Sequence, residues 1–171
     1  MRVLLLPAFV LTLAGSAAAQ GAVSGVGLGY NIAKNNLIRA AEQMPEGDYG
    51  FQATKDVRTF GQLVGHVANA NFMICATASG EANPNSADVE KTMTAKTDLV
   101  KALRDSFTFC DKAYQIADAK ALEEVTLFGS LKTNRIGALA FNAAHDMEHY
   151  GNIVTYMRLK GMVPPSSQPR N

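Results

Sequence analysis

Four long stretches of this 171-residue chain carry apolar residues at steps of three and four, the spacing that places side chains on one face of a helix. The pattern is clearest in the third stretch, where it links Leu99, Leu103, Phe107, Cys110 and Tyr114. The four stretches cover residues 31–44, 60–79, 94–117 and 134–160. Because each helix must bury its apolar face against another element, the pattern predicts an all-α four-helix bundle.

Local signals indicate where these helices begin and end. Thr59 and Gln62 have the spacing of a capping box, so the second helix is expected to start directly after Thr59. Gly80 and Gly161 suit the left-handed position that follows the last turn of a helix. No segment is a convincing strand, and residues 122–130 are ambiguous between a helical turn and an extended piece.

Residues 1–19 have the layout of a secretory signal peptide. A short positive start precedes eleven residues, Val3 to Leu13, that are apolar, and small residues then lead to Ala19. A helix that spans a bilayer needs about 20 apolar residues, so a retained membrane anchor is the weaker alternative. We expect cleavage after Ala19 and a periplasmic or secreted product.

The remaining chain divides into three parts. Residues 20–30 hold four glycines and are expected to be a flexible lead-in. Residues 31–165 form the bundle, and the short polar segment 166–171 is expected to be a mobile tail.

Loss of the leader would balance the charge of the chain. The full sequence has 16 basic and 15 acidic residues, and Arg2 would leave with the leader. A chain without net charge gives no electrostatic case for binding nucleic acid or an anionic membrane. We therefore expect a small-molecule substrate, no nucleic-acid partner and no membrane partner after cleavage, with a homodimer left open.

The two cysteines, Cys75 and Cys110, would meet an oxidising compartment if the chain is exported. Disulfides form and persist in such compartments, so we expect these two residues to be bridged. The alternative is a pair of buried free thiols, because free cysteine packs as a small apolar residue.

All three histidines of the chain are expected on inward helix faces. His145 and His149 stand one helical turn apart, so their rings point the same way. On a helix, the apolar residues Leu63, Ala70 and Met73 point in nearly the same direction as His66. Burying three imidazoles is costly unless each has a partner, and one shared divalent metal ion would satisfy all three. The sequence therefore predicts a metal site made by His66, His145 and His149.

The segment around His145 and His149 also resembles two other kinds of metal site, but its match to each is incomplete. His145, Glu148 and His149 match the H-x-x-E-H pattern of inverted zinc peptidases, in which Glu148 would be the general base. Such sites take a carboxylate ligand from further along the chain, and no Asp or Glu follows Glu148. A di-iron bundle needs two E-x-x-H units, and only the near match of Asp146 with His149 is present.

Several polar residues near the histidines have open roles. Asn142, Asn152 and Tyr156 are candidates to orient whatever binds at the metal. Asp146 or Glu148 could orient a ligand ring, the partner that metal-bound histidines usually have. Asn69, one turn after His66, could line a pocket or make an ordinary bond between helices.

The segments "HVANAN" and "AHDMEHYGNIVTYMRLKGMVPPSS" resemble those of the DinB-like proteins, also called DinB/YfiT-like. The resemblance covers roughly residues 30–167 and includes the early histidine, the HxxxH pair and the Gly-x-x-Pro-Pro ending. It implies an up-down-down-up four-helix bundle that holds one divalent ion, zinc or nickel, on His66, His145 and His149.

The function implied by this resemblance is less specific than the fold. Characterised members include S-transferases and isomerases that use a small thiol, whose pKa the metal lowers. Export puts a thiol substrate in doubt, because reduced small thiols are scarce in oxidising compartments. We expect a metal-dependent hydrolase or thiol transferase acting on a small substrate, and the alternative is a non-catalytic metal- or ligand-binding module.

Overall fold

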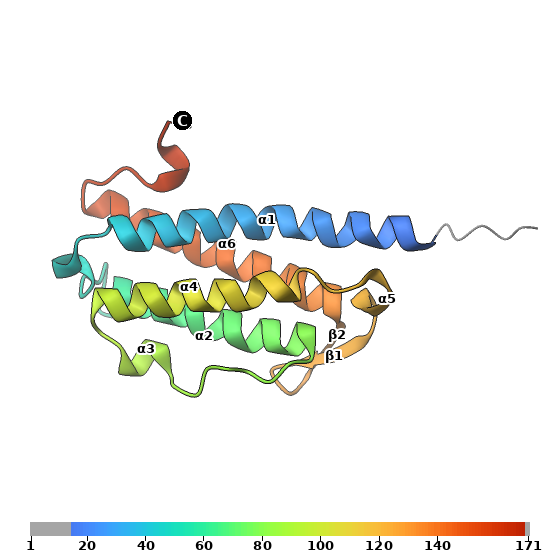
Figure 1. The fold of residues 1–171 in the computed structure, drawn as a ribbon. Coiled ribbons are helices and arrows are strands. Elements are labelled where there is room, and N and C mark those ends of the chain that lie inside the picture. Colours follow the sequence, from blue (N-terminus) through green and yellow to red (C-terminus); the bar gives the residue numbers. More distant parts are fainter. Residues whose placement is uncertain (1–14, 170–171) are drawn as a thin grey trace, which may run out of the picture.

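A computed structural model describes residues 15–169 of the chain as a bundle of four long helices (Figure 1). Residues 1–14 of the expected signal peptide lie outside the described residues, as do the last two residues of the chain. The long helices are α1 (Gly15–Gln43), α2 (Phe60–Ser79), α4 (Lys96–Ala113) and α6 (Arg135–Leu159).

The connection between α2 and α4 returns along the length of the bundle, so these two helices run in the same direction, opposite to α1 and α6 (Figure 1). Helix α1 packs against α6, helix α2 packs against α4, and contacts between α2 and α6 join the two pairs. The predicted all-α, up-down-down-up bundle is confirmed.

Short elements connect the long helices. They are the 3-10 turns η1 (Glu46–Asp48) and η2 (Pro165–Ser167), the helices α3 (Val89–Thr92) and α5 (Asp118–Ala121), and the strands β1 (Glu124–Leu127) and β2 (Leu131–Asn134). The two strands form an antiparallel hairpin, so the expectation that the chain has no strand is wrong. Strand β1 lies in the segment 122–130 that the sequence left ambiguous, and β2 follows it. Its turn has Phe128 and Gly129 at φ values of 52° and 73°, a pair of positive angles that matches the twist of a hairpin.

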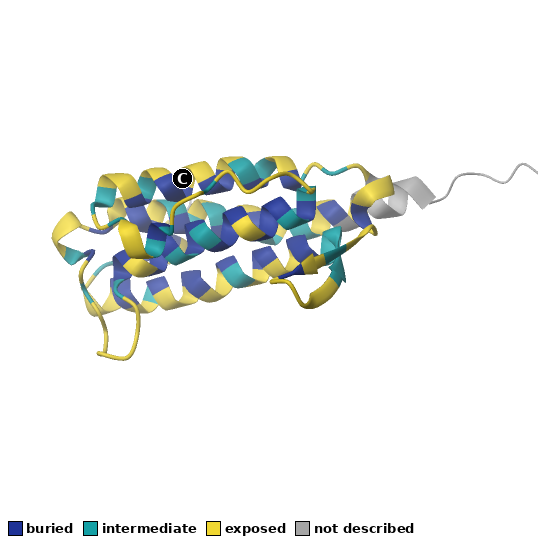
Figure 2. Ribbon diagram, turned by 90° about the horizontal axis from the view of Figure 1, so that it is seen from below, coloured by how far each residue is buried: buried dark blue, intermediate teal, exposed yellow. Residues whose placement is uncertain are grey.

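Helices α2 and α6 begin where local chemistry predicts. Both bonds of the capping box between Thr59 and Gln62 are present, and Gly80 ends α2 at φ 79°. Helix α6 is capped by Asn134, whose side chain accepts from the backbone N–H of Gly137. Each long helix turns its buried residues toward the interior of the bundle (Figure 2).

The expected flexible lead-in at residues 20–30 is wrong, because helix α1 runs through this segment. Tyr30 is 1% exposed, its ring stacks on Tyr114 at 3.8 Å, and its hydroxyl donates to Asp111 at 2.9 Å. Burial of Tyr30 and Val23 against the bundle outweighs the low helix propensity of the glycines between them.

The tail is also more ordered than expected, since residues 166–169 pack onto the bundle. The Tyr150 hydroxyl donates to Oγ of Ser166 at 2.8 Å and accepts from its backbone N–H at 2.9 Å. Gln168 donates to the Gln43 side chain at 2.9 Å, which joins the end of the chain to α1.

Cys75 of α2 and Cys110 of α4 form a disulfide in the structure, with their Cα atoms 5.2 Å apart. Both residues are fully buried, so the bridge fastens two neighbouring helices from inside the core. Among residues 15–169, no helix has the length and apolar character needed to cross a membrane.

Candidate metal centre

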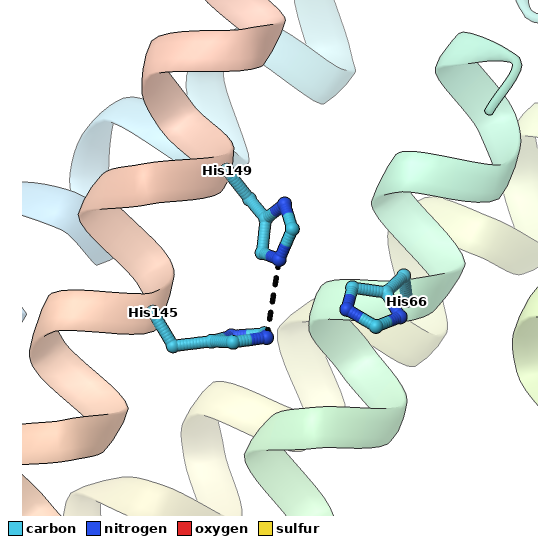
Figure 3. A group of neighbouring side chains, drawn as sticks. All are labelled: His66, His145 and His149. Carbon is cyan, nitrogen blue, oxygen red and sulfur yellow. Dashed lines mark hydrogen bonds between the residues drawn. The ribbon is translucent and has the colours of Figure 1, made fainter. Parts of the chain in front are cut away.

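The rings of His66, His145 and His149 point toward one another between α2 and α6 (Figure 3). Helix α6 supplies His145 and His149, whose Nε2 atoms are 3.1 Å apart, and α2 supplies His66. The His66 ring centroid lies 5.2 Å from that of His145 and 4.7 Å from that of His149. One nitrogen from each residue lies within 4.8 Å of the others, so the cluster could hold a metal ion.

The second nitrogen, Nδ1, has different surroundings in each ring. In His66 it lies 3.0 Å from Oε2 of Glu90, a residue of the short helix α3. In His149 it lies 3.4 Å from the side-chain amide of Asn152. In His145 it is buried and has no hydrogen-bond partner among the described residues.

Burial keeps the two rings of α6 neutral. It is the largest cause that lowers the pKa of His145 to about 4, with smaller contributions from the positive forms of His149 and His66. Burial likewise lowers the pKa of His149 to about 4, with a contribution from the positive charge of Arg58. Both imidazoles are therefore uncharged at neutral pH, which is the state that ligates metals.

The spacing of the two histidines of α6 suits a metal ion held by imidazole nitrogens. Two zinc–nitrogen bonds of about 2.0–2.1 Å at a tetrahedral angle place their nitrogens about 3.3 Å apart, close to the 3.1 Å between Nε2 of His145 and Nε2 of His149. A metal on Nε2 leaves the proton on Nδ1, and the Glu90 carboxylate is a suitable acceptor for that proton in His66. Asn152 serves His149 in the same way if its amide presents Oδ1.

Glu90 was not predicted from the sequence, and its position depends on contacts made by the rest of α2. A Cβ on Gly65 would lie 2.7 Å from Cα of Glu90, so only glycine allows the two backbones to approach this closely. Asn69 donates to Asp88 at 2.7 Å and accepts from the backbone N–H of Val89 at 3.0 Å. Asn69 therefore holds the start of α3 rather than lining a pocket.

A pocket of about 690 Å³ opens beside His149, within the range typical of small-molecule sites. It lies between α2, α3, α6 and the connection from α1 to α2. Its lining includes Lys55, Arg58, Glu90, Asn152 and Tyr156.

Two of the three predicted helper residues lie at this pocket. Asn152 and Tyr156 both line it, and the Tyr156 hydroxyl donates to the backbone carbonyl of Arg58 at 2.6 Å. Tyr156 thus anchors the segment that carries Arg58.

Asn142, the third predicted helper, belongs to the core instead. It is fully buried, its Nδ2 donates to Asn71 at 2.6 Å, and its Oδ1 accepts from Tyr114 at 3.0 Å. These bonds occupy both ends of its amide, so Asn142 cannot orient a bound molecule.

Asp146 and Glu148, which the sequence offered as partners of the ligand rings, make no hydrogen bond to them among the described residues. Asp146 is fully buried with both carboxyl oxygens unpaired among the described residues, and burial raises its pKa well above the usual range. Glu148 is exposed and does not line the pocket, a poor position for the general base of a peptidase. Met73, expected to face inward with His66, is 40% exposed.

A family model described as the DinB superfamily matches residues 30–153 of the chain, a span that contains all three histidines. Two solved structures are similar in fold. A DinB-like protein from Bacillus cereus has 15% identity and a TM-score of 0.72, over 83% of this chain and 95% of that one. A DinB-like protein from Bacillus subtilis has 21% identity and a TM-score of 0.59, over 81% of this chain and 93% of that one. No protein in the curated set matches.

Proposed function

This chain belongs to the DinB superfamily, and from that premise we propose that it is an exported metal-dependent enzyme acting on a small substrate. The observation that carries the proposal is the cluster of His66, His145 and His149 at the edge of a pocket. Three protein ligands leave a coordination position open, which is typical of catalytic rather than structural metal sites.

When bound, a zinc or nickel ion would supply Lewis-acid chemistry, since three neutral ligands leave it doubly charged, able to lower the pKa of a water to about 7 and to deprotonate a thiol. Two of the three histidine rings have partners at Nδ1 even without a bound ion. Glu90 holds the His66 ring through Nδ1, and Asn152 contacts Nδ1 of His149. Fixed rings lose little freedom on binding, and such partners usually raise metal affinity by about 10–100-fold.

The pocket provides the place for the substrate. It reaches His149 from the side of α3 and the segment before α2, so a bound molecule would lie next to His149. Hydrolysis or thiol transfer are the reactions this arrangement supports. Peptide hydrolysis of the inverted type is not supported, since Glu148 lies outside the pocket lining.

Export is supported by two independent features. Residues 1–19 have the layout of a signal peptide. The disulfide between Cys75 and Cys110 is of a kind that persists in oxidising compartments such as the periplasm or the exterior. An exported enzyme would meet few reduced small thiols, which favours hydrolysis over thiol transfer.

The test is a screen of metal-loaded mature protein against ester, amide and thiol–electrophile substrates. His145→Ala removes one ring of the cluster and should abolish turnover, whereas Glu148→Gln, an exposed change on the same helix, should preserve it. Activity that survives unchanged in His145→Ala would remove the metal from the mechanism. Binding of metal without turnover on any substrate class would favour the non-catalytic module.

A further inference from the structure

Arg58 occupies an unusual position beside the histidine cluster. Its Nε donates to Oε1 of Glu90 at 2.8 Å, and the other oxygen of the same carboxylate contacts Nδ1 of His66 at 3.0 Å. Its backbone carbonyl accepts from the Tyr156 hydroxyl at 2.6 Å. Arg58 is thus fixed at both ends, by α3 through its side chain and by α6 through its backbone.

Fixing Arg58 through Nε leaves the outer end of the guanidinium available. Within residues 15–169, neither Nη1 nor Nη2 has a hydrogen-bond partner, and 42% of the side chain is exposed. Arg58 lines the same pocket as His149, so these free donors belong to the wall of the proposed substrate site.

The charge of the pocket favours an anion once the site is loaded. Lys55 and Arg58 are balanced by Asp56 and Glu90 in the lining, and Glu90 is already engaged by Arg58 and His66. A divalent ion on three neutral imidazoles would add two positive charges at the pocket edge. A guanidinium with free Nη donors binds carboxylate and phosphate groups through paired hydrogen bonds, which an ammonium group cannot match.

We propose that Arg58 is a substrate-anchoring residue, and that the pocket takes a small molecule with an oxyanion group, either a carboxylate or a phosphate ester. This inference rests on the proposed function, because it places the anchored molecule beside the metal. It adds the class of substrate and the residue that selects it.

The experiment measures binding of benzoate, phenyl phosphate and the neutral analogue benzamide to metal-loaded protein by calorimetry. A charged hydrogen-bonding partner typically strengthens binding by about tenfold or more, so benzoate or phenyl phosphate should bind at least about ten times more tightly than benzamide. The better of the two anions identifies the oxyanion class.

Arg58→Gln should weaken binding of that anion by about tenfold, and Arg58→Lys should restore part of the loss because it keeps the charge without the planar fork. Arg104→Gln is the matched control, since Arg104 pairs with Glu42 of α1 and does not line the pocket. Metal content is measured on each variant, so that loss of the ion and loss of the anchor are separated.

A second measurement needs no variant. Phenylglyoxal modifies arginine side chains, and the modification of Arg58 in the wild-type protein can be followed by mass spectrometry beside that of Arg104. The preferred anion should slow the reaction at Arg58 and leave the rate at Arg104 unchanged, whereas benzamide should slow neither.

Equal binding of the anions by the wild type and Arg58→Gln, at equal metal content, would overturn the inference, as would modification of Arg58 that the anion does not slow. Anion binding through Arg58 in a protein that turns over no substrate would keep the inference and reject the enzyme. Anion binding that depends on the metal but not on Arg58 would reject the inference and leave the proposed enzyme in place.

Discussion

Reduction of the disulfide between Cys75 and Cys110 should destabilise the protein by about 4 kcal/mol. The bridge joins residues separated by 35 positions. In the chain-entropy model, closing a loop of that length removes about 13 cal/mol/K of entropy from the unfolded chain, which corresponds to about 4 kcal/mol at 25 °C. For a chain of this size, that change should lower the melting temperature by roughly 8–16 °C.

The assay is urea denaturation of oxidised and reduced wild-type protein, compared by the free energy of unfolding extrapolated to water. Reduced wild type keeps both sulfur atoms, so the comparison isolates the crosslink. Cys75→Ala with Cys110→Ala should lose additional stability, because each change also removes a fully buried sulfur atom from the core.

Thiol counts on the unfolded samples establish which form is present. Equal unfolding free energies for the verified oxidised and reduced forms would refute the reasoning. Two free thiols per chain in unreduced protein recovered from an oxidising compartment would show that the bridge does not form there.

Three further predictions concern other parts of the molecule. The free energy of unfolding of the metal-free protein should fall as the pH drops from about 6.5 toward 4, because the pKa values of His145 and His149 are about 4 in the folded state and the unfolded chain therefore binds protons first. The pKa shift of His149 alone corresponds to about 3 kcal/mol, and an unfolding free energy that stays constant over this pH range would contradict the prediction. Gly65→Ala should weaken metal binding, because the added Cβ would lie 2.7 Å from Cα of Glu90 and would displace Glu90 from His66. Titration with zinc measures the affinity, and an unchanged affinity would show that Glu90 has no part in holding His66. Full-length protein expressed in an exporting bacterium should be recovered outside the cytoplasm with Gln20 as its first residue, and mass spectrometry showing an intact leader there would contradict the signal peptide.

The long helices and the histidine pair were predictable because both depend on local geometry. Residues four apart on a helix face the same way whatever surrounds them, which is enough to bring His145 and His149 together. The inward position of His66 followed from Leu63 and Ala70 around it, and the structure brings its ring to the same point.

Glu90 could not be predicted in the same way, because its contact with His66 depends on a four-residue helix that folds back onto α2. The one local signal was Gly65 inside an apolar helix, since an interior glycine often marks the close approach of another backbone. That signal indicates a close contact without saying which segment makes it.

Asn142 shows the limit of assigning residues to a helix face by spacing. It lies three residues before His145, close to the histidine stripe, yet neighbouring helices cover it, and its amide forms hydrogen bonds with Asn71 and Tyr114.

The error at residues 20–30 has the opposite cause. Weak local helix propensity was outweighed by a distant partner, because Tyr30 packs on Tyr114.

Metal analysis of mature protein purified without a histidine tag tests the central claim most directly. The account predicts about one divalent ion per chain, with loss of the ion in His149→Ala and retention in Glu148→Gln, an exposed change one residue away. Full metal occupancy in a His66→Ala/His145→Ala double variant would contradict the assignment of the site.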